Sequence, residues 1–573
     1  MTINTECPLL HLSMELIVKI IGYNPPSSYR DVALTCTTLH RRCQPILNRH
    51  RAAHAKYKVT SDLSPETVVD LLSDTAMARV ERWHVRELEL WGSRQSWDEW
   101  RPWDPKLSGM RRLADGTPTR SGLDQGEITR YIRTANDWWM FPGEAHDEIR
   151  QNLESGHDGF LKLLLIASCP RLHSIKFVKR GSDTHTSLQW ITKAVKWCKE
   201  FKKWPPGFES LRNAVVGIST GLPSSEDAEV QRNPYDLSAL LQFPKIESVY
   251  YSDLIEVDEL DDEDEWSPMI EYDFPQGTST VKHLFLDSLP SLPYRLRRSL
   301  LDMPKVLETM VIRAPDSSGQ HVDDVDCVVS QLGRNNPQTM QRLVFYNPSG
   351  LHGYRCNVYR PEELENYRAL KQLTIAASDI ELDAFYQSTK DRLPTREDLC
   401  EFASEAFPAT IEAMVIWGQS GVHIDERKSA KPSDYLDSAI AHLIESGVYE
   451  NLRVVYLEDV ERAHQQPERE VLLGNPVVAG RKQPAFPRAM AAGQKAGVHV
   501  CTLMNRDDGG YWRSFPARPD RFDLKTGPYG ERPASWKFNT LTGEWGPSCD
   551  GCGKCNDCLR VYPEELWKSN AAS

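Results

Sequence analysis

A six-residue phrase, apolar-x-x-apolar-x-apolar, recurs from residue 80 onward and constrains the fold more than any other feature of this sequence. Chance alone produces the phrase at about 6% of positions when 40% of residues are apolar, so its setting matters more than its count. In ten places the phrase also has the composition of a strand, and in five of these a proline lies two or three residues earlier, where a helix should end. The ten strand candidates are VRELEL from Val85, LHSIKF from Leu172, LRNAVV from Leu211, IESVYY from Ile246, VKHLFL from Val281, LETMVI from Leu307, MQRLVF from Met340, LKQLTI from Leu370, IEAMVI from Ile411 and LRVVYL from Leu452.

Helical stretches such as DVDCVVSQL and YLDSAIAHLIES precede several of these strands. A unit of helix, turn and strand cannot bury its apolar side alone, so neighbouring units should stack into one array. We therefore predict an α/β fold, an irregular solenoid similar to leucine-rich repeats over residues 80–505. From Ile246 to Leu452 the phrases start 26–41 residues apart, whereas the usual leucine-rich period is about 20–29. An unrelated α/β domain with a parallel sheet would show the same alternation, and only its curvature would differ.

Two insertions are expected to interrupt the array. Residues 92–157 are rich in turns and charges and contain five tryptophans, at Trp97, Trp100, Trp103, Trp138 and Trp139. Such a segment either folds onto its own domain or forms a recognition surface, because tryptophan offers a large apolar area with few rotatable bonds. Residues 256–265, EVDELDDEDE, hold eight acids and no base, which is typical of a solvated loop and compatible with a surface that attracts a basic substrate.

Charge excludes some classes of function. The chain has 573 residues and a net charge of −13, so it lacks the basic surplus that a general nucleic-acid binder needs. No apolar run approaches the roughly 20 residues that span a bilayer, and the first residues lack a basic region followed by an apolar core. We expect a soluble protein of the cytoplasm or nucleus, without nucleic-acid or membrane partners.

The first sixty residues differ from the rest in charge and pattern. They hold eight bases and three acids. Apolar residues recur at helical spacing up to Ile21, Ser13 is placed to cap the helix, and Asn24 with two prolines prevents its continuation. Further apolar positions indicate about three short helices within some forty residues. A unit this small buries too little core by itself, so a surplus apolar face on it indicates a docking surface.

This segment resembles the F-box family. The stretches LLHLSMELIVKII and PPSSYRDVALTCTTLHRRCQPIL are similar to the family pattern Leu-Pro-x-Glu-Leu, a helix with paired aliphatics, and a later apolar-x-x-Cys-x-x-Leu. The match covers residues 8–50 within a helical domain predicted at 8–58, and Ser13 stands where the family usually has proline. The motif positions are Leu12, Glu15, Leu16, Ile20, Ile21, Val32, Leu34, Cys36 and Leu39.

The resemblance implies that these residues bind the Skp adaptor of a cullin-RING ubiquitin ligase, as in fungal F-box proteins with degenerate leucine-rich-like repeats. The repeat array would then bind a protein substrate, and the chain would supply no catalytic residue. A scaffold that uses the adaptor without the ligase is compatible with the same residues. So is an ordinary helical cap on the following domain, because aliphatic spacing of this kind is common in amphipathic helices.

One motif suggests catalysis. Gly217, Ser219 and Gly221 match the G-x-S-x-G nucleophile elbow, which requires a helix directly after the serine. The following residues, Leu-Pro-Ser-Ser, indicate a loop instead, so a serine hydrolase is the weaker hypothesis and we expect no enzyme activity.

The cysteines fall into two groups. Nine are scattered along the chain and are expected to be reduced, small, buried residues. The tail, residues 506–573, holds Cys549, Cys552, Cys555 and Cys558, which are candidate ligands of a structural zinc. The two C-x-x-C pairs are contiguous rather than separated as in most zinc sites, so an iron–sulfur cluster and a metal-free segment remain alternatives. No cofactor is otherwise required.

Overall fold

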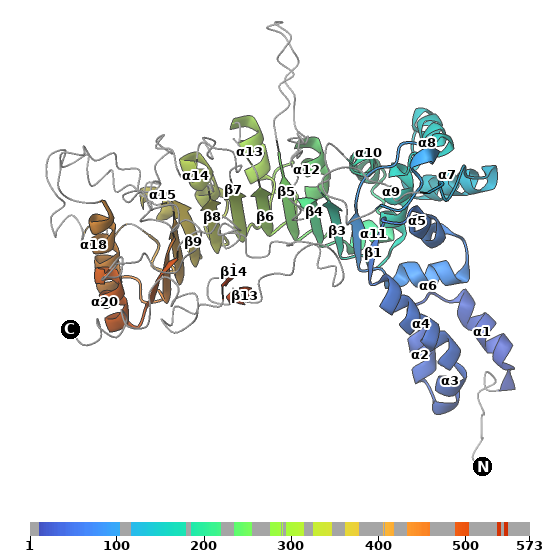
Figure 1. The fold of residues 1–573 in the computed structure, drawn as a ribbon, viewed down its shortest axis with the longest axis horizontal. Coiled ribbons are helices and arrows are strands. Elements are labelled where there is room, and N and C mark those ends of the chain that lie inside the picture. Colours follow the sequence, from blue (N-terminus) through green and yellow to red (C-terminus); the bar gives the residue numbers. More distant parts are fainter. Residues whose placement is uncertain are drawn as a thin grey trace, which may run out of the picture. The chain divides into compact units, whose positions relative to one another are not determined.

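The structure is a computed structural model of the whole chain (Figure 1). It describes residues 11–103, 116–178, 185–218, 234–254, 275–287, 289, 294–313, 325–346, 361–376, 401, 405, 407–417, 432–458, 487–503, 536–539 and 544–547. The chain divides into two compact units. The first comprises mainly Met1–Val230 and Ala239–Ile246, and the second mainly Gln231–Ser238 and Glu247–Asp523.

The first unit begins with four helices: α1 (Met14–Tyr23), α2 (Ser28–Leu34), α3 (Thr37–Arg42) and α4 (Gln44–Tyr57). Strand β1 (Val59–Ser61), helices α5 (Pro65–Leu72) and α6 (Ala76–His84), and strand β2 (Glu87–Leu90) follow. After the 3₁₀ turn η2 (Trp97–Glu99) come α7 (Gln125–Trp139), α8 (Gly143–Ser155), α9 (Gly159–Ser168), β3 (Ser174–Val178), α10 (Thr186–Phe201), α11 (Pro206–Ser210) and β4 (Asn213–Ile218). The four strands are parallel and pair in chain order.

Helix α12 (Pro234–Leu241) precedes the strands of the second unit, which also pair in chain order and in parallel. They are β5 (Ser248–Ser252), β6 (His283–Asp287), β7 (Thr309–Arg313), β8 (Arg342–Tyr346), β9 (Gln372–Ala376), β10 (Ala413–Trp417), β11 (Val454–Glu458) and β12 (His499–Leu503). Between them lie α13 (Tyr294–Asp302), α14 (Val325–Asn335), α15 (Pro361–Leu364), α18 (Pro432–Glu445) and α20 (Pro487–Ala496). Helices α13, α14 and α15 run along one side of strands β6–β9 (Figure 1).

The ten predicted strands are all confirmed. Each begins two residues after the first apolar position of its phrase, so Leu172 precedes β3 and Leu307 precedes β7. The three apolar positions of a phrase are buried in the core, as Leu172, Ile175 and Phe177 show with 0% exposure. The prediction of an α/β fold with parallel strands and alternating helices is confirmed as well.

Two parallel strands escaped prediction because their phrases are broken. By register, β1 aligns Thr60 with Leu88, and Asp62, two residues later and directly after the strand, stands where the last apolar position should be. In β12, Thr502 pairs with Leu457, and Gly497 occupies the place that Leu452 holds in β11. Polar residues and glycine replace apolar ones in these two phrases, so the apolar pattern is lost. Backbone hydrogen bonds to the neighbouring strand form nevertheless, because parallel pairing depends on the backbone.

The second unit buries both faces of its strands. Phe285, Val311 and Val344 stand in one row across β6, β7 and β8, on the face opposite Leu284 and its neighbours, and none is more than 2% exposed. This agrees with the general behaviour of parallel sheets, which are covered on both sides. None of the helices that the structure describes is long and apolar enough to cross a membrane.

Candidate protein-docking site

Helix α1 presents the first part of the candidate site. Ser13 caps it as predicted, since its Oγ accepts a hydrogen bond of 3.4 Å from the backbone N–H of Leu16. The backbone N–H of Glu15 and the Ser13 hydroxyl lower the pKa of the Glu15 carboxyl. The helix ends at Tyr23, and the N–H of Asn24 donates to the carbonyl of Ile21 at 2.9 Å before the two prolines. Local capping thus fixes both ends of this short helix.

A compact core holds α1 to α4 together and includes one residue of α6, Val80. Five of the motif residues belong to this core or pack partly buried against it on the inner side of the helices. The buried members of the cluster are Ile17, Ile21, Tyr29, Ala33, Leu39, Cys43, Ile46, Ala53 and Val80, and the partly buried ones are Leu12, Val32, Cys36 and Leu47. Ile21 is 2% exposed and Leu39 is 5% exposed, so neither side chain is available to a partner in this conformation.

Three other motif residues face outward. Leu16 is 48% exposed, Ile20 is 40% exposed and Leu34 is 64% exposed, and they are among the largest exposed apolar side chains described. Leu16 and Ile20 are four residues apart and share one stripe of α1, whereas the neighbouring stripe of Ile17 and Ile21 is buried. Full burial of such a side chain is worth about 1.5–3 kcal/mol, so half-exposed ones retain roughly 1 kcal/mol each for a partner.

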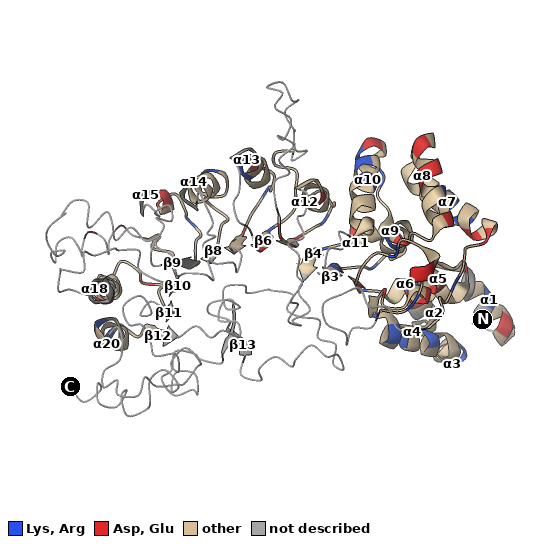
Figure 2. Ribbon diagram, turned by 45° about the horizontal axis from the view of Figure 1, so that its top comes forward, with Lys and Arg blue, Asp and Glu red and all other residues tan. Residues whose placement is uncertain are grey.

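Polar contacts stiffen the loops around this surface. Arg42 of α3 donates from Nη1 to the carbonyl of Leu12 at 2.8 Å, which ties the end of α3 to the start of α1. The Cys36 sulfur accepts from the N–H of Leu39 at 3.4 Å and caps α3. In Figure 2 the ribbons of α3 and α4 carry blue stretches that mark Lys and Arg residues, in keeping with the basic start of the chain.

A histidine pair joins α4 to α6. His50 Nδ1 lies 2.9 Å from His84 Nε2, and the two rings meet edge to face with their centroids 5.0 Å apart. Burial, His50 and nearby arginines lower the pKa of His84 to about 4, and burial also lowers the pKa of His50. Both rings are therefore neutral at pH 7, and one can donate to the other.

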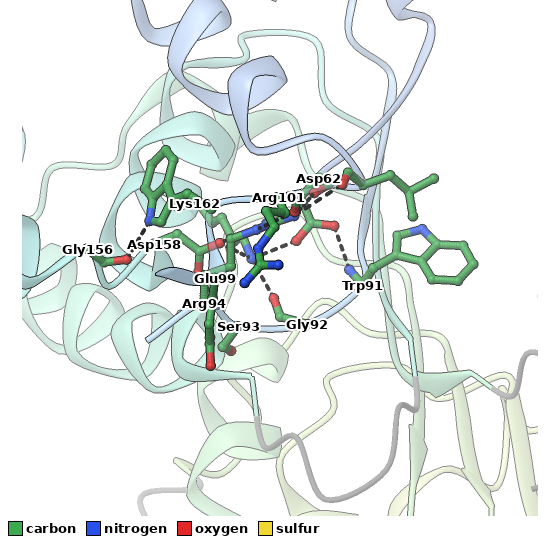
Figure 3. Close-up of polar contacts among 12 residues, drawn as sticks. Asp62, Trp91, Gly92, Ser93, Arg94, Glu99, Arg101, Gly156, Asp158 and Lys162 are labelled. Carbon is green, nitrogen blue, oxygen red and sulfur yellow. Dashed lines mark hydrogen bonds and ion pairs between the residues drawn. The ribbon is translucent and has the colours of Figure 1, made fainter. Parts of the chain in front are cut away.

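A buried group of charges fixes the tryptophan-rich insertion to its own unit (Figure 3). Lys162 of α9 is fully buried, with Nζ 2.6 Å from Asp62 Oδ2 and 2.8 Å from Asp158 Oδ2. The first contact is an ion pair without hydrogen-bond alignment. Arg94 pairs with Asp158 at 3.1 Å and donates to the carbonyls of Asp62, Leu63 and Arg101. Two cations and two carboxylates balance, so each buried charge has an opposite charge beside it.

The insertion itself packs inward. Trp100, Trp103 and Trp139 are buried, and Trp100 Nε1 donates to the carbonyl of Gly156 at 2.7 Å. Gly156 has φ +92°, and a Cβ there would lie 2.6 Å from the N atom of Trp97, so only glycine fits. These contacts favour the interpretation that the tryptophans attach the insertion to its own domain. Helices α7 and α8 were not predicted within it.

Other predicted sites lie outside the described residues. These are Ser219, the acidic run 256–265 and all four tail cysteines, Cys549, Cys552, Cys555 and Cys558. In the part of the tail that is described, Trp536–Asn539 (β13) and Glu544–Pro547 (β14) form an antiparallel pair. Among the described residues, no group of three or more His, Cys, Asp or Glu side chains is placed to hold a metal ion.

The side chains of five of the scattered cysteines are described, and none of these five forms a disulfide. Cys43, Cys169 and Cys198 are buried as predicted, and burial raises the pKa of Cys169 and of Cys198 to about 12. Cys36 is half-buried. Cys327 is exposed, so the prediction was wrong for this residue.

Comparison with known proteins adds no relative: no family model matches this chain, and no curated protein matches it significantly. The function must therefore be argued from the residues and geometry above.

Proposed function

We propose that this protein is the substrate-recognition adaptor of a cullin-RING ubiquitin ligase of the Skp–cullin–F-box type. Its first helices would bind the Skp adaptor, and the repeat array would hold a protein substrate. The mechanism is proximity, because tethering raises the effective concentration of a substrate lysine near the charged transfer enzyme. The chain itself would supply no catalytic group.

The observation that carries the proposal is the outward stripe of Leu16 and Ile20 together with Leu34. A helical unit whose core is already filled by Ile17, Ile21 and Leu39 has no internal use for these three side chains. Exposed apolar groups of this size cost solubility unless a partner covers them. The Skp adaptor is the partner that the resemblance of residues 8–50 to an F-box implies.

Burial in the second unit excludes part of the strand surface as a contact for the substrate. In the second unit the strand row of Phe285, Val311 and Val344 is buried, so this row is closed to a substrate in the described conformation. We expect substrate contacts from strand ends, helices and loops instead.

Affinity purification of the full chain from cell extract tests the proposal. Recovery of both Skp and cullin supports the ligase, recovery of Skp alone supports an adaptor-bound scaffold, and recovery of neither refutes both. The decisive variant is Leu16→Asp/Ile20→Asp, which places charge in the expected apolar contact and should abolish Skp capture.

A matched control distinguishes loss of docking from general damage. Met140→Asp/Val448→Asp also changes two exposed apolar side chains, 55% and 37% exposed, outside the helical unit. It should capture Skp as the unmodified protein does. If Leu16→Asp/Ile20→Asp still captures Skp, the docking surface has been placed wrongly.

A further inference from the structure

The residue directly before each strand occupies an equivalent place in every repeat. Its carbonyl accepts hydrogen bonds from two successive N–H groups of the next repeat, as Arg86 does from His173 at 2.8 Å and Ser174 at 3.1 Å. Lys58 and His173 accept in the same way from the repeats that follow them. The backbones at these positions therefore lie side by side, about one strand spacing of 4.8 Å apart.

The two units fill this position with different charges. Unit 2 alternates acids and bases, and its charges pair: Lys282 lies 3.3 Å from Glu308, and Lys371 lies 3.0 Å from Glu412. The complete series before β5–β11 is Glu247, Lys282, Glu308, Gln341, Lys371, Glu412 and Arg453, and that before β1–β4 is Lys58, Arg86, His173 and Arg212. Unit 1 thus has no acid at this position.

A further arginine joins the row in unit 1. Arg171 and Arg86 both stack on Trp83, with their Cζ atoms 4.2 and 5.6 Å from the ring centroid, so the two guanidinium groups lie within about 10 Å of each other. Arg171 is exposed and Arg86 half-buried. Neither makes an ion pair with any described carboxylate. Glu87, which follows Arg86 in the chain, is paired instead with Lys176 at 3.0 Å.

The lowered pKa values of two residues in the row indicate that positive charges lie close together at this position. Burial and Arg171 lower the pKa of Arg86 to about 10, and burial with the charges of Arg86, Arg212 and Arg171 lowers the pKa of His173. Glu89, also near Lys176, has its pKa raised to about 8 by burial and so adds little negative charge at pH 7. An added anion would relieve this repulsion.

We infer that the starts of strands β1–β4 form a binding site for an acidic segment of a protein partner, with Arg86 and Arg171 as its main contacts. The row from Lys58 to Arg212 crosses three strand spacings, about 14 Å, which an extended peptide spans in about four residues. A line of cations suits a linear run of carboxylates better than a single small anion. This inference does not depend on the ligase proposal, because it concerns a different surface from Leu16 and Ile20.

Fluorescence anisotropy of the full chain with a fluorescein-labelled peptide of eight glutamates tests this site. We expect binding that weakens steeply between about 50 and 150 mM salt, and no binding of the matching glutamine peptide. Arg86→Gln/Arg171→Gln should weaken binding at least tenfold. Lys282→Gln/Lys371→Gln removes the same net charge from the residues before strands β6 and β9 of unit 2 and should change affinity less than twofold.

Three results would overturn the inference: no binding of the glutamate peptide, equal losses in the two double variants, or tighter binding of a twenty-nucleotide oligothymidine than of the peptide. Arg86 also donates to the carbonyls of Trp83 and Val85, so its loss could disturb the fold. Arg171→Gln alone avoids this, because Arg171 is exposed and stacks on Trp83. It should still weaken binding about threefold with an unchanged melting temperature.

Discussion

Removing the Lys162 charge should destabilise the first unit strongly. In Lys162→Met a side chain of similar length replaces a fully buried ammonium that contacts Asp62 and Asp158 at 2.6 and 2.8 Å. Arg94 then faces two buried carboxylates alone, and the group carries one uncompensated negative charge. Breaking a buried ion pair in this way typically costs 3–5 kcal/mol, and we expect a loss in that range.

A second substitution should restore much of this loss. Asp62→Asn removes the unpaired charge but keeps an oxygen that can accept from the N–H of Trp91, which Asp62 Oδ1 binds at 2.7 Å. In Lys162→Met/Asp62→Asn the remaining Arg94 and Asp158 form a neutral pair. We expect the double variant to lose only about 1–2 kcal/mol, which gives a coupling energy of at least about 2 kcal/mol.

Urea unfolding followed by tryptophan fluorescence measures these losses, because Trp91 is buried and its backbone N–H binds Asp62 of the charged group (Figure 3). The transition of the first unit should shift by about 1 M or more in the single variant and by much less in the double variant. If the double variant is as unstable as the sum of the two single ones, the charges do not compensate one another and the reasoning fails.

Two further predictions concern buried side chains, and a third concerns the tail cysteines. His84 has a folded pKa of about 4, below its unfolded value, so its contribution is complete above pH 6.5 and is lost as the pH falls toward 4. Urea unfolding should show that the free energy of unfolding falls by about 1–2 kcal/mol by pH 4.5, a loss that is absent in His84→Gln. Leu39→Ala should cost about 2–4 kcal/mol whereas Leu34→Ala should cost less than about 0.5, and equal losses in thermal melts would contradict the placement of these side chains. Metal analysis of the purified chain should find about one zinc that Cys552→Ser abolishes, and a metal-free unmodified protein would rule out the zinc hypothesis.

The sequence predicted the repeating strands well because the apolar pattern of each strand lies within six consecutive residues. Each phrase places three apolar side chains in the core, as Val281, Leu284 and Leu286 do, and Leu284 and Leu286 share a face because residues two apart lie on the same side of a strand. Helices α7 and α8 were missed because the turns, charges and tryptophans around them dominated the composition of the insertion. The pairing of distant residues such as Arg94 and Asp158 cannot be read from local pattern at all.

The sequence predicted which residues belong to the candidate docking site, but not which of them face outward and which are buried. Aliphatic residues at i, i+3 and i+4 form an apolar stripe, and spacing alone does not say which edge of the stripe faces the core. The structure separates Leu16 and Ile20, which face outward, from Ile21, which is buried. That separation depends on where α4 and Val80 pack, which is tertiary information.

Asp62 shows what a broken pattern means in this protein. It occupies the last apolar position of the first repeat, where a carboxylate would normally prevent burial, yet it is 0% exposed. Lys162 from α9 provides the opposite charge, and the same lysine holds Asp158, next to the end of the tryptophan-rich insertion. A leucine at position 62 would restore the last apolar position but leave Lys162 and Arg94 with a single carboxylate. The contacts of Asp62 therefore explain why this repeat lacks its last apolar residue. The Asp62 carboxylate takes the place of an apolar side chain directly after β1, and through Lys162 it helps to hold the insertion that follows β2.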